Sequence, residues 1–160
     1  VVPVPGLSSR VVYAQPHTVS RVPMTRGNAW LRCAWCGEER PLDLRPYCHI
    51  CGGTLEVRDI GPVVGGVASG LWSYAAALPV PARVSLGEGG TPLTRLERIG
   101  RDDEIYIKAE WTNPTGSFKE RGSAVAVSAA LAVGAPGGVS PSTGTNASSV
   151  SASAPLAGLP

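Results

Sequence analysis

The sequence predicts an α/β fold with a parallel sheet, preceded by a small cysteine-rich ribbon. Two observations support this prediction. Residues 104–160 follow the order strand, loop, helix, strand, loop, helix, which is typical of a βαβ unit. All cysteines of the chain fall between Cys33 and Cys51. We therefore divide the 160 residues into a tail expected to be disordered (1–29), the ribbon (30–60) and an incomplete α/β part (61–160).

Charge and hydropathy exclude several classes of protein. The formal net charge is only +2, and neither a polybasic arm nor a stripe of basic and aromatic residues is present, so we expect no nucleic-acid partner. Since the sequence also lacks a run of 18 apolar residues and a convincing signal peptide, we expect a cytoplasmic protein that does not enter a membrane.

The cysteines form two C-x-x-C pairs with the spacing of a zinc ribbon. Cys33 and Cys36 are followed, after eleven residues, by Cys48 and Cys51. Two such turns can point four thiolates at one ion, and glycines follow each pair, where a tight turn often needs positive φ. A closed four-thiolate site would be structural, with His49 as a bystander. The alternatives are two disulfides, which need an oxidising compartment, or a redox C-x-x-C motif.

The helices and strands after the ribbon are predicted from the periodicity of apolar residues and from the prolines and glycines that interrupt it. Residues 61–70 are predicted to be a glycine-rich linker, and residues 71–80 a short helix that ends at the following prolines. Alternation predicts a strand at 104–110, and an alanine-rich run predicts a buried helix from Lys119 to Leu131. A weak strand is expected within 136–144, followed by a helix from about residue 148 that breaks at Pro155.

Lysine is rare, because twelve of the 14 cationic residues are arginine and only Lys108 and Lys119 are lysine. Lys119 follows the loop NPTGSF at the start of the predicted helix, where a helix N-terminus disfavours the ammonium form. A free amine is what Schiff-base chemistry needs. Taken alone, the residue is better explained as an ordinary surface lysine at a helix start.

Several segments together resemble a known family. SLGEGGTPL (85–93), YIKAEWTNPTGSFKERG (106–122) and SPSTG (140–144) resemble the pyridoxal-phosphate enzymes of fold type II. The order of ribbon, LW-Y segment, LGEGGTPL and NPTGSFK is most similar to the threonine synthase family. The resemblance covers about residues 30–160. It implies that residues 61–160 are the N-terminal portion of a fold type II catalytic domain.

The resemblance also implies a reaction and its residues. Lys119 matches the lysine that binds pyridoxal 5'-phosphate and then acts as general base at the α-carbon of the substrate. The substrate would be O-phosphohomoserine, which loses phosphate and gains water to give threonine. Ser142, Thr143 and Gly144 match the loop that binds the substrate carboxylate, and Lys108 has a family-like position near the substrate. A homodimer of the full-length protein is a further expectation.

The chain departs from the family at several points. Asp is usual after the lysine, where this chain has Glu120. Thr145 stands where the family has an asparagine that contacts the cofactor ring, and Asn146 comes one residue later. Both are our cofactor-binding candidates, although a shift of one residue turns a helical side chain by about 100°. Pro155 interrupts a helix that is smooth in the family.

The length of the chain and its differences from the family leave three interpretations open. The chain ends before the glycine-rich loop that binds the cofactor phosphate, so we expect a fragment that is inactive alone. The first alternative is a zinc-ribbon scaffold module with a degenerate appendage. The second is another fold type II enzyme, such as a cysteate synthase or a threonine dehydratase.

Overall fold

The computed structural model describes residues 29–65, 69–81, 84–99 and 103–160. Its first unit is the ribbon, a three-stranded antiparallel sheet in the order β2-β1-β3. The strands are β1 (Trp30–Cys33), β2 (Glu39–Pro41) and β3 (Leu55–Arg58). Nearly all of the tail that we expect to be disordered lies outside the described residues.

Each cysteine pair sits in a tight turn that a glycine makes possible. The Gly37 amide donates to the Cys33 carbonyl at 3.1 Å, and the Gly52 amide donates to the Cys48 carbonyl at 2.9 Å. Both glycines have positive φ, +75° and +73°, which other residues rarely adopt. The glycine signal in the sequence is therefore confirmed at both turns.

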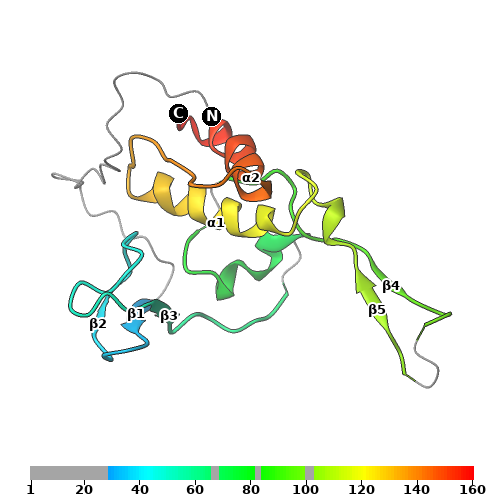
Figure 1. Ribbon diagram of the computed structural model, residues 1–160, viewed down its shortest axis with the longest axis horizontal. Helices are drawn as coiled ribbons and strands as arrows, with labels where there is room; N and C mark the ends of the chain where they lie inside the picture. The colour runs from blue at the N-terminus through cyan, green and yellow to red at the C-terminus, as the bar shows by residue number, and fades with distance from the viewer. Residues whose placement is uncertain (1–28, 66–68, 82–83, 100–102) are drawn as a thin grey trace.

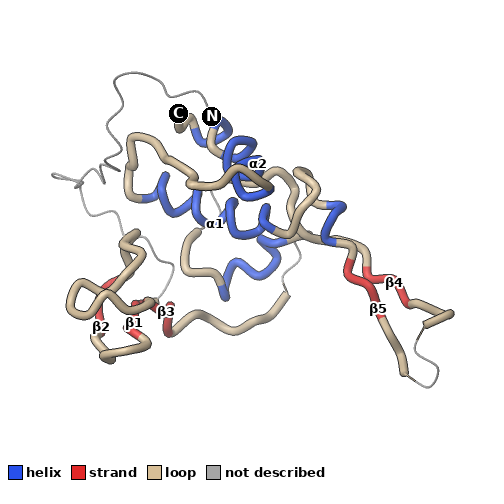
Figure 2. The backbone as a smooth tube through the Cα atoms, viewed as in Figure 1, coloured by secondary structure: helices blue, strands red, loops and turns tan. Residues whose placement is uncertain are grey.

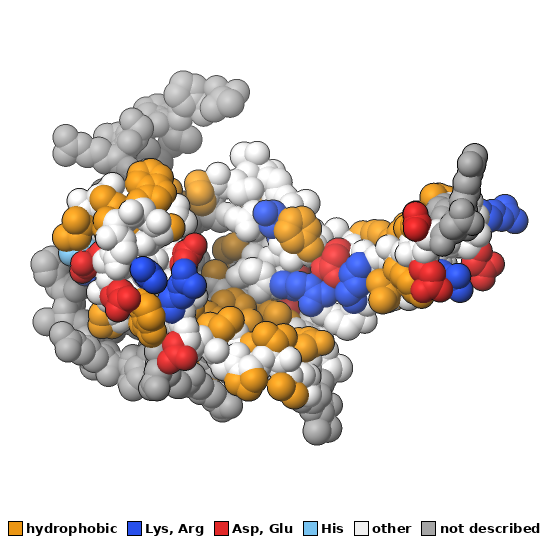
Figure 3. All heavy atoms as spheres, turned by 90° about the horizontal axis from the view of Figure 1, so that it is seen from below, with side chains coloured by type: hydrophobic (Ala, Val, Ile, Leu, Met, Phe, Trp, Pro, Cys, Tyr) orange, Lys and Arg blue, Asp and Glu red, His pale blue; other side chains and the backbone are white. Residues whose placement is uncertain are grey.

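The second unit contains a hairpin that projects from the helices as an arm (Figures 1 and 2). Strands β4 (Leu93–Arg95) and β5 (Tyr106–Lys108) pair antiparallel, and all of their residues are exposed. β5 occupies the middle of the segment 104–110 for which alternation predicts a strand. Acidic and basic side chains lie next to one another along this arm (Figure 3).

The expectation of a parallel sheet is wrong for the described residues. Every strand pair there is antiparallel, and residues 136–144 form a loop in place of the expected weak strand. Pro136 and Pro141 cannot donate ladder hydrogen bonds, and the two glycines between them weaken a strand further. In addition, β5 pairs with β4 in a hairpin that projects away from the helices. Among the described residues, β5 is therefore not available as a parallel partner for this loop.

The helices agree closely with the sequence prediction. A 3₁₀ helix, η1 (Leu71–Ala77), precedes the hairpin, and a second, η2 (Glu110–Thr112), follows it. The long helix α1 (Lys119–Ala132) packs against α2 (Thr145–Ser153), and η3 (Pro155–Ala157) begins at the proline expected to break the helix. No helix among the described residues is long and apolar enough to span a membrane.

The core around α1 is built from small side chains. Ala124, Val127, Ala129 and Ala132 are buried on α1, and Val80 and Val84 are buried in the chain that leads to the hairpin. Ser128 is fully buried and its hydroxyl accepts the Val84 amide at 3.2 Å. The core therefore depends on close approach of the backbones as well as on apolar area, and a few buried polar contacts fix its geometry.

Candidate functional site

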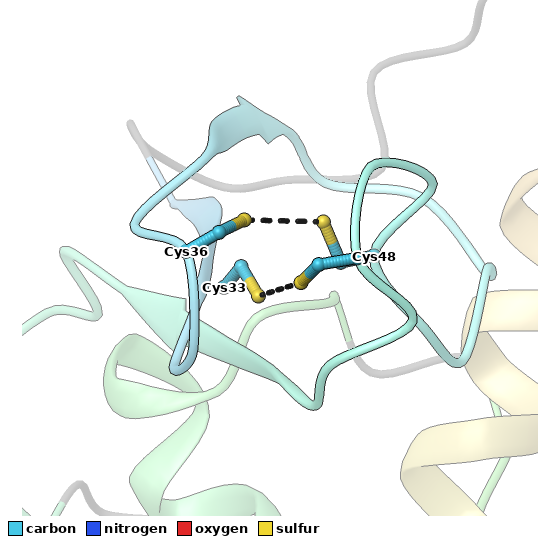
Figure 4. Close-up of side chains that lie close together, drawn as sticks. Cys33, Cys36 and Cys48 are labelled. Atoms are coloured by element: carbon cyan, nitrogen blue, oxygen red, sulfur yellow. Dashed lines mark hydrogen bonds between the residues drawn. The ribbon is translucent and has the colours of Figure 1, made fainter.

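The four cysteine sulfurs of the ribbon converge on one point. All lie within 4.8 Å of one another, with 3.4 Å from Cys33 to Cys51 and 3.7 Å from Cys36 to Cys48 (Figure 4). A tetrahedral zinc ion with sulfur bonds of about 2.3 Å would set these sulfurs about 3.8 Å apart, whereas a disulfide needs about 2.05 Å. The thiols are free, and the arrangement fits a metal better than it fits two disulfides.

The backbone approaches the cluster closely at Gly53. A Cβ added at Gly53 would lie 2.9 Å from Sγ of Cys33 and 2.8 Å from the ring of Trp35. His49 points elsewhere, with its Nδ1 at 3.4 Å from the guanidinium of Arg40, and is not part of the cluster. Among the described residues, the ligands gathered at this point are therefore four cysteine sulfurs, which is one of the usual ligand sets of a structural zinc site.

The thiols of one pair differ in acidity. The hydrogen bond from the Cys36 amide is the largest cause that lowers the pKa of Cys33 to about 6, and it outweighs the effect of burial. At Cys36, the Glu38 amide lowers the pKa, but hydrogen bonds with the neighbouring thiols, above all that of Cys51, and burial raise it to about 12. One thiol thus ionises readily near neutral pH, which favours the capture of a soft cation.

The second candidate site lies around Lys119, the first residue of α1. Its amine is exposed and sits 4.8 Å above the ring of Phe118, which is also exposed. No ion pair between Lys119 and a carboxylate occurs within the described ranges. The loop before it turns through Gly116, whose φ is +76° and whose amide donates to the Asn113 carbonyl at 2.8 Å. The loop therefore ends in an exposed lysine that has no acidic partner among the described residues.

A cluster of polar side chains fixes that loop to the rest of the unit. Glu110 accepts two hydrogen bonds from Arg121, at 2.8 Å each, and one from the Thr91 hydroxyl at 2.6 Å. The amide of Asn113 donates to the carbonyl of Glu110 at 2.7 Å. The hydrogen bonds from Arg121 are the main cause that lowers the pKa of Glu110 to about 2. The hairpin, the loop and α1 are therefore tied together by one ionised carboxylate.

The loop SLGEGGT (85–91) packs against the same cluster. The Gly89 amide donates to the side-chain oxygen of Asn113 at 2.9 Å, and the Leu71 amide donates to the Glu88 carbonyl at 2.9 Å. A Cβ at Gly89 would lie 2.5 Å from the Leu71 nitrogen, so only glycine allows this approach. The two motifs that carry the family resemblance thus touch each other in space.

The other residues that we predict for the site have hydrogen-bond partners or exposures of their own. Ser142 accepts the Gly144 amide at 3.2 Å, and Thr143 and Gly144 are exposed in the loop before α2. Thr145 begins α2 and is exposed, whereas the Asn146 amide donates to the Ser140 hydroxyl at 3.2 Å. No hydrogen bond joins any of these residues to Lys119 in the part of the chain that the structure describes.

Lys108, the other lysine, lies on β5 and has an amine that is already engaged. Its Nζ donates a hydrogen bond to the Thr91 carbonyl, at the base of the hairpin. This contact ties β5 to the loop 85–91. The two lysines therefore differ in chemistry, because one amine donates to a backbone carbonyl and the other faces solvent.

Sequence reasoning missed the cluster of Glu110, Arg121, Thr91 and Asn113. A signal for it exists in the printed sequence, because residues 109–160 contain only four charged side chains, at 110 and at 119–121. Isolated charges in a segment this poor in charge are expected to pair with one another. The hydroxyl and amide members, by contrast, have no comparable signal.

The residues around Lys119 fit part of what pyridoxal phosphate requires. The cofactor needs an accessible lysine amine on a rigid support, and both are present. Lys119 would hold its aldehyde carbon, and the loop 113–118, fixed by Glu110 and Arg121, would hold the lysine in place.

Comparisons with known proteins identify a family and several relatives. Residues 84–160 match the family model described as "Pyridoxal-phosphate dependent enzyme". Threonine synthase of Methanocaldococcus jannaschii is 38% identical over 136 residues, covering 76% of this chain and 34% of the relative. The threonine synthase of Methanosarcina acetivorans is 35% identical, covering 81% and 35%, and that of Mycobacterium leprae is 42% identical, covering 54% and 26%.

The chain therefore spans about a third of the length of the first two of these relatives. No solved structure gives a significant match. The matched region contains both glycine-rich motifs, the arm, α1 with Lys119, and α2. Through residues 84–160, the chain belongs to the family of pyridoxal-phosphate dependent enzymes.

Proposed function

We propose that this chain is the N-terminal part of a threonine synthase-like lyase that converts O-phosphohomoserine to threonine and phosphate. The observation that carries the proposal is the environment of Lys119. An exposed amine with no acidic partner among the described residues stands on a loop that the pair of Glu110 and Arg121 holds in place. That loop lies in the region matched to pyridoxal-phosphate enzymes, and the relatives quoted above are named threonine synthases.

Each predicted residue has a proposed task. When bound, pyridoxal phosphate withdraws electrons from the α-carbon of an amino acid and so acidifies its proton. Lys119 would bind the cofactor, and its amine, once displaced by substrate, would take that proton. Ser142, Thr143 and Gly144 would bind the substrate carboxylate through hydroxyls and backbone amides in front of α2.

The roles of the remaining candidates are more restricted by their contacts. Thr145 is free to face a cofactor ring from the first turn of α2, whereas Asn146 would first have to leave Ser140. Lys108 would reach substrate only after releasing the Thr91 carbonyl. A small-molecule substrate, a cytoplasmic location, a homodimer of the longer protein and the lack of a nucleic-acid partner remain our predictions.

We further propose that the ribbon binds one structural zinc ion through Cys33, Cys36, Cys48 and Cys51. The convergence of the four sulfurs supports it, and a closed thiolate site leaves no position for a substrate. Metal analysis of the purified, reduced chain should give about one zinc per chain. A content far below one under reducing conditions would contradict the assignment.

The reaction is tested in a chimeric protein that has the full length of a relative. A chimeric protein would join residues 1–160 to the remaining sequence of the Methanocaldococcus jannaschii relative, and phosphate release from O-phosphohomoserine would be followed. Lys119→Ala should abolish release, because the amine is lost, whereas Arg95→Lys on the exposed arm should retain most of it. Turnover of O-phosphoserine with sulfite, or of threonine to 2-oxobutanoate, would favour the other fold type II enzymes. If the folded chimera neither binds cofactor nor releases phosphate, the scaffold interpretation is favoured.

A further inference from the structure

The residue after Lys119 is a buried acid with partners on two separate segments. Glu120 is 0% exposed although it lies in the first turn of α1. One carboxylate oxygen accepts the Thr115 amide at 3.0 Å and also the Thr115 hydroxyl. The other oxygen accepts the Ser153 hydroxyl at 3.3 Å. No cation pairs with Glu120 within the described ranges, so hydrogen bonds alone satisfy it.

The first of these contacts fixes the loop from which Lys119 emerges. Thr115 lies five residues before Glu120, on the turn that passes through Gly116. Because Glu120 binds both the amide and the hydroxyl of Thr115, the carboxylate closes this turn onto α1. The backbone direction of Lys119, which lies between the two anchors, is then set by the same contact.

The second contact fixes α2. Among the hydrogen bonds of the described residues, the one from Ser153 to Glu120 is the only side-chain bond that joins α1 to α2. The hydroxyls of Ser123 and Ser149 are buried on the same two helices, but they have no hydrogen-bond partner in the described part of the chain. Since α2 is a rigid helix, anchoring its last residue also orients its N-terminus and the loop 142–144 before it.

We propose that Glu120 is a positioning residue that holds the Lys119 loop and α2 in one fixed arrangement. Its value for catalysis rests on the proposed function, because Lys119 would take the α-proton of a substrate whose carboxylate the loop 142–144 would bind. The bridge itself stands on the contacts of the carboxylate alone. Both oxygens are engaged, with partners five residues before Glu120 and 33 residues after it, so a side chain one methylene shorter cannot reach both partners.

Three variants distinguish the effect of side-chain length at position 120 from the effect of its charge. Glu120→Gln keeps the length, and its oxygen can accept from Thr115 while its NH₂ donates to Ser153. Glu120→Asp keeps the charge but shortens the side chain. Ser153→Ala removes only the contact with α2 and leaves the Thr115 contact in place.

The test is amide hydrogen exchange of the whole chain without cofactor, read at α2 and at the ribbon. Ser153→Ala and Glu120→Asp should each raise exchange in α2 about tenfold, since each loses a buried hydrogen bond to a charged group. The double variant should exchange no faster than either single variant. Glu120→Gln should remain within about twofold of the unmodified chain, and ribbon amides should not change in any variant.

Two results would overturn the proposal. In the first, α2 exchange is unaffected by Ser153→Ala; in the second, the effects of Ser153→Ala and Glu120→Asp simply add. Loss of protection in Glu120→Gln equal to that in Glu120→Asp would also overturn it, because a side chain of the right length would then not be enough to hold α2. Cofactor is not present in this measurement, so failure of the proposed function would leave its outcome unchanged.

Discussion

Removal of the charge on Glu110 should destabilise the second unit in a way that depends on pH. Hydrogen bonds, first from Arg121 and then from Thr91, lower the pKa of Glu110 from 4.5 to about 2, a difference worth about 3 kcal/mol at full strength. Both side chains are more than a quarter exposed, so solvent screening reduces this to about 1–2 kcal/mol. For a unit of this size, Glu110→Gln should therefore lower the Tm by about 5–10 °C at pH 7.

The direction of the pH dependence follows from the lowered pKa. A carboxylate with a lowered folded-state pKa contributes stability above its unfolded pKa of 4.5 and loses it as the pH falls to about 2. The difference in Tm between the unmodified chain and Glu110→Gln should therefore shrink to near zero across this range.

The matched control is Glu104→Gln. Glu104 pairs with Arg95 at 3.1 Å on the exposed arm, so its loss should cost well under 1 kcal/mol. Thermal unfolding of the three proteins, followed by circular dichroism from pH 7 to pH 2, measures both effects. A Tm difference for Glu110→Gln that stays constant over this range, or that equals the difference for the control, would refute the reasoning.

Three further predictions concern packing and the metal. Gly89→Ala should lower the free energy of unfolding in urea more than Gly87→Ala does. Both glycines have φ of +90°, but of the two only Gly89 has a backbone nitrogen, that of Leu71, 2.5 Å from the added Cβ. Equal losses in the two variants would contradict this close contact between the backbones. Ser128→Ala should cost about 1–2 kcal/mol through loss of its bond from Val84, and Ser123→Ala, whose hydroxyl has no partner, should cost close to nothing. A chelator should unfold the ribbon while leaving the circular dichroism of α1 in place.

The sequence predicts local features of this fold well where a single residue type dictates the backbone. Gly37 and Gly52 have the positive φ that a C-x-x-C turn suggests, and Pro155 ends α2 as expected. The helix beginning at Lys119 is also correct at both ends to within one residue. In each case the cause is local, so neighbouring residues are enough to predict it.

Longer-range features escaped prediction for a physical reason. The βαβ order of elements suggests a parallel sheet, but strand pairing depends on which edges meet, and β5 pairs with β4 in an antiparallel hairpin. The burial of Glu120 is equally hidden, because its partners lie five residues before it and 33 residues after it. Asn146 could be predicted only in part. Its displacement by one residue from the family position is visible in the sequence, but its hydrogen bond to Ser140 is not.

The central claim is that Lys119 is the amine that binds pyridoxal phosphate, and covalent trapping tests it most directly. The chain would be incubated with the cofactor, reduced with borohydride, digested and mapped by mass spectrometry. Only Lys108, Lys119 and the terminal amine of Val1 can react, so three peptides decide the result. We predict that the label lies mainly on Lys119, because Lys108 donates to the Thr91 carbonyl, and that Lys119→Arg removes it. Equal labelling of all three amines, or a label that persists on Lys108 in place of Lys119, would contradict the claim.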